Sequence, residues 1–139
     1  MESHRIYSLR AREIMNPDIV MVSPLSTVYE AVQKMIGHGC QVVIVDRADE
    51  SDAYGILTYQ EVAYRVMTKS LEPMRVRVGD IMVKPLIVVN PNLRLPFIAQ
   101  FFANTNIQNA PVIEEHALVG IITTCDLARA LVSDENSDT

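Results

Sequence analysis

Apolar positions along the chain follow two patterns, short continuous runs and recurrences at three and four residues, and their order occurs twice. Continuous β-branched runs are typical of buried strands, whereas the recurrences predict amphipathic helices. In the first half the pattern predicts a helix, a strand, a helix, two strands and a helix at 10–15, 19–22, 28–36, 42–45, 54–58 and 59–67. The second half repeats this order at 78–82, 86–89, 95–103, 110–113, 118–123 and 124–132.

Helix-breaking residues support these boundaries. Pro17 ends the first short helix, because the residue before a proline is pushed out of the α region. Ser26 or Thr27 can cap the next helix, and the glycines at 37 and 39 stop it. Pro96 fits a helix only near its first turn. The helical faces expected to be buried are Val28, Ala31, Val32, Met35 and Ile36; Val62, Ala63, Val66 and Met67; and Leu95, Ile98, Ala99, Phe102 and Ala103.

Short sequence landmarks show that the two halves are copies of one unit. The segment 55–61 reads Gly-Ile-Leu-Thr-Tyr-Gln-Glu, and 65 residues later 120–126 reads Gly-Ile-Ile-Thr-Thr-Cys-Asp. Ile14-Met15 returns as Ile81-Met82 at a shift of 67. We therefore expect an α/β (α+β) fold with two β-α-β-β-α repeats, at 8–70 and 78–133, joined by a connector at 71–77. Each repeat is near the lower size limit for independent folding, so we expect the pair to form one pseudo-twofold module.

Charge and cysteine content narrow the partners and the compartment. The chain has 139 residues, 49% of them apolar, and a formal net charge of −5, which argues against nucleic acid as a partner. The acids concentrate at 46–52 and in a C-terminal tail, 134–139, that we expect to be disordered. The rest of the chain is nearly neutral, so its net charge does not exclude an anionic small ligand. We see no membrane-length apolar run and no signal peptide, and Cys40 and Cys125 fit small, buried, reduced thiols, so we expect a cytoplasmic protein without a membrane partner.

The order of these landmarks resembles the CBS domain, the repeat named after cystathionine β-synthase. The resemblance rests on a helix ending before Asn16-Pro17, then Ser26-Thr27-Val28 opening a helix, then Gly-apolar-apolar-Thr-x-x-acid, and it covers about residues 8–133. Two tandem copies resemble the CBS pair, or Bateman module. The resemblance implies two clefts that commonly bind adenosine nucleotides, and a frequent homodimer.

The second repeat carries the better match to a nucleotide site. Thr123 ends a strand, and Asp126 falls in the first turn of the next helix, where a carboxylate is favourable and can accept both ribose hydroxyls. Arg129, one turn later, is a candidate phosphate partner. Thr123 and Asp126 can equally well cap the helix and do nothing else. By the family pattern, Ile87 and the start of the next strand, Asn109, Ala110 and Pro111, would line an adenine slot; core packing is an equal account of these side chains.

The first repeat departs from this pattern. Its candidate site residues are Thr58, Glu61 and Val20. The Glu61 side chain is longer than that of Asp126. Tyr64 stands where the second repeat has Arg129, and Val43 stands where it has Pro111. This cleft could bind weakly, bind another nucleotide or stay empty.

No catalytic machinery is evident, and we expect a regulatory module rather than an enzyme. We find no Walker loop, dinucleotide fingerprint or nucleophile–base pair. His38 and Cys40 supply only two candidate metal ligands, fewer than a metal site needs. The expected function is sensing of an adenosine nucleotide, AMP first and ADP or ATP as alternatives, in the manner of an energy sensor. With no room for a regulated domain in a chain of this length, a stand-alone pair would act through a separate, unknown effector protein. The alternatives are a structural dimerisation module without nucleotide and a sensor of an adenosyl cofactor.

Overall fold

The computed structural model describes residues 5–137, with the side chains of 133–137 left out. The described chain divides into two compact units of mixed helix and strand, and each is treated by itself. The first-repeat unit is Ile19–Leu86. The second-repeat unit combines the described residues up to Asp18 with those from Ile87 onward. The expected mixed α/β composition is therefore confirmed.

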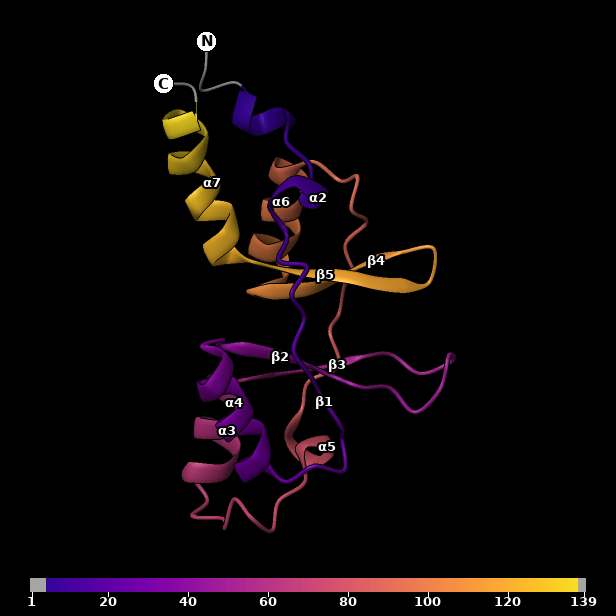
Figure 1. The fold of residues 1–139 in the computed structure, drawn as a ribbon, viewed down its shortest axis with the longest axis vertical. Coiled ribbons are helices and arrows are strands. Elements are labelled where there is room, and N and C mark those ends of the chain that lie inside the picture. Colours follow the sequence, from indigo (N-terminus) through magenta and orange to yellow (C-terminus); the bar gives the residue numbers. More distant parts are fainter. Residues whose placement is uncertain (1–4, 138–139) are drawn as a thin grey trace. The chain divides into compact units, whose positions relative to one another are not determined.

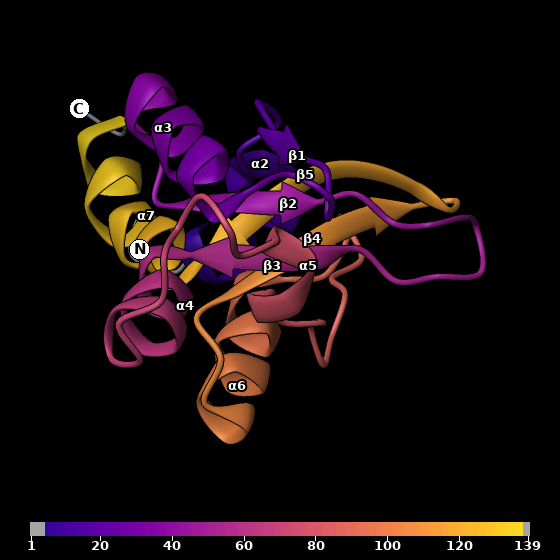
Figure 2. The ribbon, with the colours of Figure 1, turned by 90° about the horizontal axis from the view of Figure 1, so that it is seen from below.

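The first-repeat unit is a small mixed sheet covered by helices. β1 (Met21–Val22) pairs in parallel with β2 (Val42–Val45), which pairs antiparallel with β3 (Gly55–Thr58). α3 (Val28–His38) and α4 (Tyr59–Val62) lie on one side of this sheet in Figure 1. In Figure 2, β2 and β3 run between α3 on one flank and α4 on the other. η2 (Ala63–Met67) continues α4 with π-helical geometry, and α5 (Val78–Ile81) follows the connector.

The second-repeat unit has the same order around a hairpin. β4 (Asn109–Glu114) and β5 (Ala117–Thr123) pair antiparallel, and α6 (Leu95–Thr105) and α7 (Thr124–Ser137) lie on one side of them (Figure 1). η1 (Ile6–Ser8) and α2 (Ala11–Ile14) come from the start of the chain. The backbone of α7 extends through most of the segment predicted to be an acidic tail, and residues 138–139 lie outside the described part.

Each unit buries its own apolar core. The buried residues of the first-repeat unit include Met35 and Leu57, both 0% exposed, and a fully buried side chain of this size contributes roughly 1.5–3 kcal/mol. Its core residues are Val22, Val28, Ala31, Met35, Val43, Val45, Leu57, Val66, Val78 and Ile81. The second core comprises Ala11, Val89, Leu95, Ile98, Phe102, Ala110, Val112, Ile122 and Ala130.

The two cores exchange the short helices that precede each repeat. Val78 and Ile81, on α5, are buried in the core of the first repeat, although they open the second repeat in the sequence. Ala11, on α2, is 0% exposed in the core of the second repeat, and its N–H donates to Leu93 O at 2.9 Å. The compact unit of the structure is therefore not the contiguous repeat of the sequence.

The strand predicted at 86–89 is reduced to a single residue. Only Val89 forms a bridge, parallel to Val112: its N–H donates to Pro111 O at 2.9 Å and its carbonyl accepts from Ile113 at 3.0 Å. Leu86 and Val88 are 76% and 56% exposed. Prolines at 85 and 91 flank this segment and supply no N–H for a longer ladder.

Some predicted helical faces were also wrong in detail. Val28, Ala31 and Met35 are buried on α3, but Ile36 is 67% exposed because it lies about 100° around the helix from Met35. Met67 is 76% exposed after the π-helical turn, which adds a residue and rotates the following side chains. On α6 the alanines at 99 and 103 are exposed. Pro96 does lie in the first turn of α6, as predicted.

Candidate functional site

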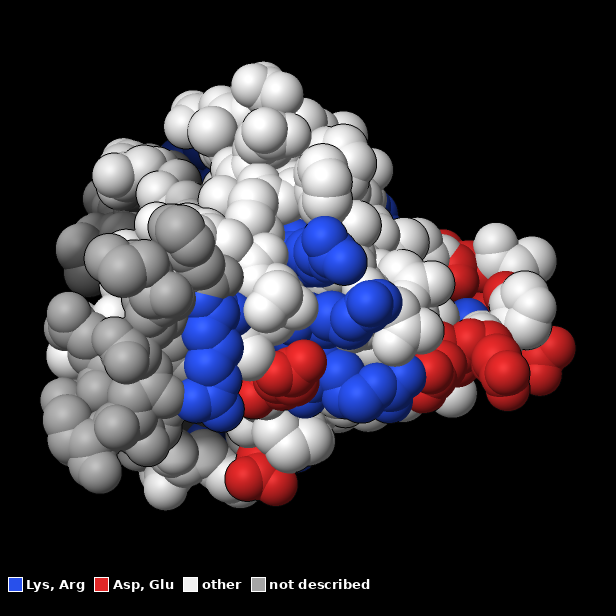
Figure 3. All heavy atoms as spheres, turned by 90° about the horizontal axis from the view of Figure 1, so that it is seen from above, with Lys and Arg blue, Asp and Glu red and all other residues white. Residues whose placement is uncertain are grey.

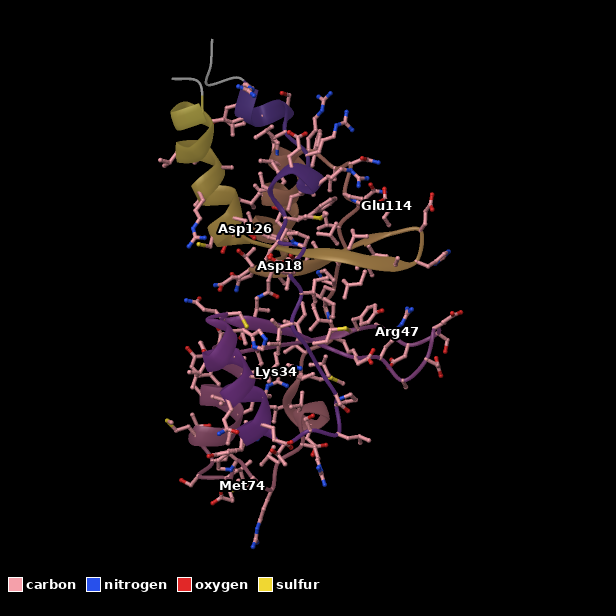
Figure 4. All side chains as sticks on the ribbon, in the orientation of Figure 1. Asp18, Lys34, Arg47, Met74, Glu114 and Asp126 are labelled. Atoms are coloured by element: carbon pink, nitrogen blue, oxygen red, sulfur yellow. The ribbon has the colours of Figure 1, made fainter. Side chains whose placement is uncertain are left out.

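The candidate site of the second repeat lies where β5 passes into α7. Asn109 and Thr123 are opposite each other at the open end of the β4–β5 hairpin. The Thr124 N–H donates to Gln108 O at 2.9 Å, so the hairpin and the first turn of α7 are held together. Figure 4 shows Asp126 at the start of α7, beside the end of β5. The topology therefore brings Asn109, Thr123 and Asp126 to one strand–helix junction.

Thr123 and Asp126 form a reciprocal cap. The backbone N–H and the hydroxyl of Thr123 donate to Asp126 Oδ2 at 2.9 and 3.1 Å, and the Asp126 N–H donates to Thr123 Oγ1 at 3.2 Å. This arrangement satisfies helix N–H groups that have no partner within the helix. The capping alternative raised by the sequence is thus present. It uses the Thr123 hydroxyl as both donor and acceptor, and the bonds to Asp126 go to Oδ2, so Oδ1 is the oxygen left for a ligand.

The residues expected to line an adenine slot have mixed environments. Ala110 is 0% exposed within the core, and Pro111 is buried with its carbonyl bonded to Val89. Ile87 is partly buried and packs against the same core. Asn109 is partly exposed at the edge of the hairpin. Core packing therefore accounts for Ala110 and Pro111, while Ile87 and Asn109 keep surface that a ligand can contact.

Arg129 is placed one turn after Asp126 and is exposed. Within the described residues it has no ion-pair partner, whereas Asp126 is partly buried. An exposed guanidinium without a carboxylate partner can offer both of its edges to an anion. The geometry thus leaves Arg129 available, with no hydrogen bond fixing its position.

The first repeat has the same cap at the same place. The N–H and hydroxyl of Thr58 donate to Glu61 Oε1 at 2.9 and 2.5 Å, and the Gln60 N–H donates to Thr58 Oγ1 at 3.2 Å. Val20, at the start of this unit, packs against its core, and its carbonyl accepts from Ile44 at 2.9 Å. Both repeats therefore present an acid at the third position of a helix that follows a strand.

Strand register corrects one predicted equivalence between the repeats. Thr58 is opposite Val42 as Thr123 is opposite Asn109, and Ile44 is opposite Ile56 as Pro111 is opposite Ile121. The residue in the place of Pro111 is therefore Ile44, not Val43. The turns before the two strands are equally long, residues 39–41 and 106–108, so the shift of 67 that relates the earlier landmarks continues into these strands.

Sequence reasoning missed the residues that pack against the repeated glycines. A Cβ on Gly120 would lie 2.7 Å from Met15 Sδ, and a Cβ on Gly55 would lie 2.6 Å from Met82 Sδ. Both methionines belong to the Ile-Met pair that is repeated in the sequence, and this repeat could have pointed to a shared packing role. Each methionine thus fixes the exchanged helix against the strand that leads to the capping threonine.

Basic side chains near the N-terminus are engaged with neighbours rather than gathered around a cavity. Arg10 Nη1 donates to Asn92 O at 3.0 Å, and Arg12 binds Asn92 Oδ1 and forms an ion pair with Glu114. The hydrogen bond from Arg12 holds the pKa of Glu114 below its ordinary value. Figure 3 shows Lys and Arg side chains interspersed with acids on this face.

Metal ligands, membrane-spanning helices and cysteine thiols were the remaining features to locate in the described part of the chain. Across residues 5–132 no group of three or more His, Cys, Asp or Glu side chains could hold a metal ion. None of the described helices is long and apolar enough to cross a membrane. Cys40 is partly buried and Cys125 is exposed, and both thiols are free, so the expectation that both are buried was wrong for Cys125.

Two α/β units of one pattern, each with a Thr-x-x-acid cap at a strand–helix junction, define a tandem-repeat protein. The CBS domain family model matches residues 11–68 and 78–133, and the chain therefore belongs to the CBS domain family, with two copies. This family supplies regulatory modules.

Solved structures share both fold and sequence with the chain. A hexameric CBS-CP12 protein from bloom-forming cyanobacteria is 38% identical with a TM-score of 0.83, over 88% of this chain and 71% of that one. An uncharacterized conserved protein from Pyrococcus horikoshii is 26% identical with a TM-score of 0.79, over 89% and 92%.

Curated relatives include proteins that are longer than the aligned part. Uncharacterized protein MK0525 of Methanopyrus kandleri is 30% identical over 86% of this chain, which spans 61% of that relative. Mitochondrial CBSX3 of Arabidopsis thaliana is 28% identical, and the chain spans 56% of it. Hypoxic response protein 1 of Mycobacterium tuberculosis is 28% identical over 87% of this chain and 84% of its own length.

Proposed function

We propose that this CBS pair is a regulatory module that binds an adenosine nucleotide at the junction of β5 and α7. The observation that carries the proposal is the cap itself: Asp126 is held in place through Oδ2 by two donors from Thr123. A carboxylate fixed in this way can offer Oδ1 to ribose hydroxyls without first losing side-chain freedom. AMP is the proposed ligand, with ADP and ATP as alternatives that differ only at the phosphate end.

Further residues would complete the nucleotide site. Ile87 would pack against the base, Asn109 would contact its edge, and Arg129 would bind phosphate through its two-pronged guanidinium. Ala110 would act through its backbone, because its side chain belongs to the buried interior. Pro111 has no N–H and its carbonyl accepts from Val89, so it would only shape the wall of the slot. In the first repeat, Thr58, Glu61 and Val20 would form a second and weaker site, since the longer Glu61 side chain places its carboxylate differently.

The signal would be a change in conformation or assembly that an effector protein reads. A ligand shifts such an equilibrium only by as much as it prefers one arrangement over another. We propose self-association, in the first instance a homodimer. The exposed aromatic side chains Phe97 and Phe101, 49% and 47% exposed and one turn apart on α6, support a surface for a second copy. The hexameric state of the cyanobacterial CBS-CP12 protein is a second possible assembly.

Isothermal titration of nucleotide-stripped protein with AMP, ADP and ATP tests the proposal. We expect saturable binding by at least one of them, and Asp126→Ala should weaken it by about tenfold or more, because a hydrogen bond to a charged group contributes roughly 1.5–3 kcal/mol. Light scattering on the same samples, with and without nucleotide, measures the change in mass.

A matched control separates ligand contact from capping. Glu30→Ala removes the equivalent cap of α3, where the Glu30 N–H donates to Thr27 Oγ1 at 3.1 Å and the Thr27 N–H donates to Glu30 Oε1 at 2.9 Å. It should lower stability as Asp126→Ala does and leave nucleotide affinity unchanged. Equal losses of affinity in the two variants would contradict the proposed contact. Absence of heat with all three nucleotides would favour an adenosyl cofactor or a structural module.

A further inference from the structure

A hollow of about 420 Å³ lies in the first-repeat unit, away from the β3–α4 junction. It is bounded by η2, by the connector at 71–77 and by α5. Figure 1 shows this connector as the loop between the end of η2 and α5, and Figure 4 labels Met74 within it. We call this feature the connector hollow. Its volume falls within the range of small-molecule sites, roughly 300–1,000 Å³.

Three cations line the connector hollow. Arg65 comes from η2, Lys69 from the turn after it, and Arg75 from the connector. Asp80 is the one acid among the lining residues, so the lining carries a net charge of +2 (three cations less one acid), in a chain of net charge −5. This sign reversal is local, and it favours an anion.

No acid among the described residues forms an ion pair with these cations. Arg65 Nη1 donates to the Ile81 carbonyl at 3.3 Å, and within this part of the chain the rest of its guanidinium has no acceptor. Within the described residues, neither Lys69 nor Arg75 has an ion pair or a side-chain hydrogen bond, and Asp80 pairs with none of the three. Like charges in one hollow repel each other unless a counter-ion lies between them.

The repeated fold does not require Lys69 or Arg75. The π-helical turn adds a residue, so Val66, and not Arg65, takes the buried place of Ala130, both being 5% exposed. Lys69 then corresponds to Ser133 in the second repeat, and at the shift of 67 Arg75 corresponds to Ser8. These two cations are therefore particular to the first-repeat unit.

The hollow also has apolar walls. Ile81 is 4% exposed and belongs to the core, Val76 packs against that core, and Leu71 is 43% exposed. Such walls suit the uncharged part of a ligand, whereas two guanidinium groups and an ammonium suit a phosphate of more than one negative charge.

We propose that the connector hollow binds a small organic phosphate, with Lys69 and Arg75 contacting the phosphate and Leu71 and Val76 contacting the organic group. Arg65 holds the end of α5 through Ile81 and offers its remaining N–H groups to the same anion. This site does not involve Asp126, so a test of phosphate binding here is separate from a test of the proposed nucleotide site. A ligand here would link η2 to α5, the helix that the second repeat contributes to the first-repeat core.

The test is titration of the ¹⁵N-labelled full chain with phenyl phosphate and, separately, inorganic phosphate, at one fixed ionic strength. We expect saturable shifts confined to amides of residues 63–81, a Kd for phenyl phosphate below about 1 mM, and weaker binding of inorganic phosphate, which cannot use the apolar walls. Equal affinity for the two probes would overturn the assignment to an organic phosphate. No saturation with either would overturn the site.

Variants that keep the fold sharpen this test. Arg75→Gln should weaken phenyl phosphate several-fold, and Asp80→Asn should tighten it, because it removes the acid from the lining. Arg94→Gln is the matched control: it makes the same change of charge at an exposed arginine of the other unit. A loss with Arg94→Gln equal to that with Arg75→Gln would show non-specific charge attraction only and overturn the proposal. Asp126→Ala should leave binding of phenyl phosphate in this hollow unchanged.

Discussion

At the scale of single residues, three helix starts in the described chain have an acid three positions after a threonine. The pairs are Thr27 with Glu30, Thr58 with Glu61 and Thr123 with Asp126. In the first pair, the hydrogen bond from the Thr27 backbone lowers the pKa of Glu30 below its ordinary value of 4.5. Such a cap is complete only while the carboxylate is ionised.

This lowered pKa predicts an acid-dependent loss of stability. A carboxylate whose pKa is lower in the folded state stabilises the fold above the unfolded pKa, and the contribution disappears as the pH falls through the folded pKa. Glu30→Gln should therefore lower the urea midpoint near pH 7, and the difference from the parent protein should shrink below about pH 4.5. Urea unfolding of both proteins across this range measures it. A difference that stays constant down to pH 3 would contradict an ionic cap.

At the scale of elements, the repeated glycine of each unit allows a short helix to pack against a strand. A Cβ on Gly120 would lie 3.0 Å from Met15 Cγ and 3.1 Å from the Asn16 carbonyl. This carbonyl accepts from the Ile121 N–H of β5, and the Asn16 N–H donates to the Ile121 carbonyl. The methionine end can move, but the backbone carbonyl cannot move without breaking these bonds. The glycine is therefore needed for close approach, not for an unusual φ.

Gly120→Ala should lower the free energy of unfolding by about 1–3 kcal/mol, as overpacking does elsewhere. Gly37→Ala is the control, because it lies within α3 with no atom within 4 Å of the added Cβ. This control should be neutral or stabilise by about 0.5–1 kcal/mol, since alanine is the better helix former. Chemical denaturation of both variants gives the comparison. A loss in Gly37→Ala as large as that in Gly120→Ala would rule out close packing as the cause.

At the scale of the whole molecule, each core is completed by a helix that belongs to the other repeat in the sequence. Asn16 and Ile121 exchange two backbone hydrogen bonds, at 2.9 and 3.0 Å, and Ile56 and Val83 do the same in the other unit, at 2.8 and 2.9 Å. The start of the described chain is therefore part of the second-repeat unit. A destabilising substitution there should lower the stability of residues that are distant in the sequence.

Ala11→Asp should destabilise the second repeat first. It places a charge at a position that is 0% exposed, and an uncompensated buried charge costs about 3–5 kcal/mol. Hydrogen exchange should show amides at 87–132 losing protection before those at 19–68. Ala48→Asp, at an exposed loop position, is the control and should change neither. Earlier loss at 19–68 would contradict the observed exchange of helices.

Sequence patterns were sufficient where the cause is local. The helix that begins after Thr27 and stops at Gly39, which has a φ of 63°, was predicted because caps and left-handed stops depend on adjacent residues. The strands β2 to β5 followed from their apolar runs. The pairing of Thr123 with Asp126 was one of two predicted roles, and its distances show the cap. Whether Oδ1 also binds ribose stays a prediction.

Long-range packing explains the features that the sequence patterns did not predict. Ile36 and Met67 have the right residue type for a core, but only the direction of each helix and the π-helical turn show that they face outward. The strand predicted at 86–89 is reduced to the bridge at Val89, whose partner Val112 lies in β4. The connector hollow combines three cations from different segments, and no motif joins them.

The sequence by itself determined the repeat, its order of elements and the acid that caps each final helix, because these depend on side chains a few residues apart. Only the tertiary structure decided which core each short helix enters. A four-residue helix such as α2 or α5 buries only one or two apolar residues, too few for a pattern that points to one repeat. The choice is made by contacts with distant parts of the sequence, such as Met15 against Gly120 for α2 and Met82 against Gly55 for α5. Such contacts leave no periodic signal along the chain.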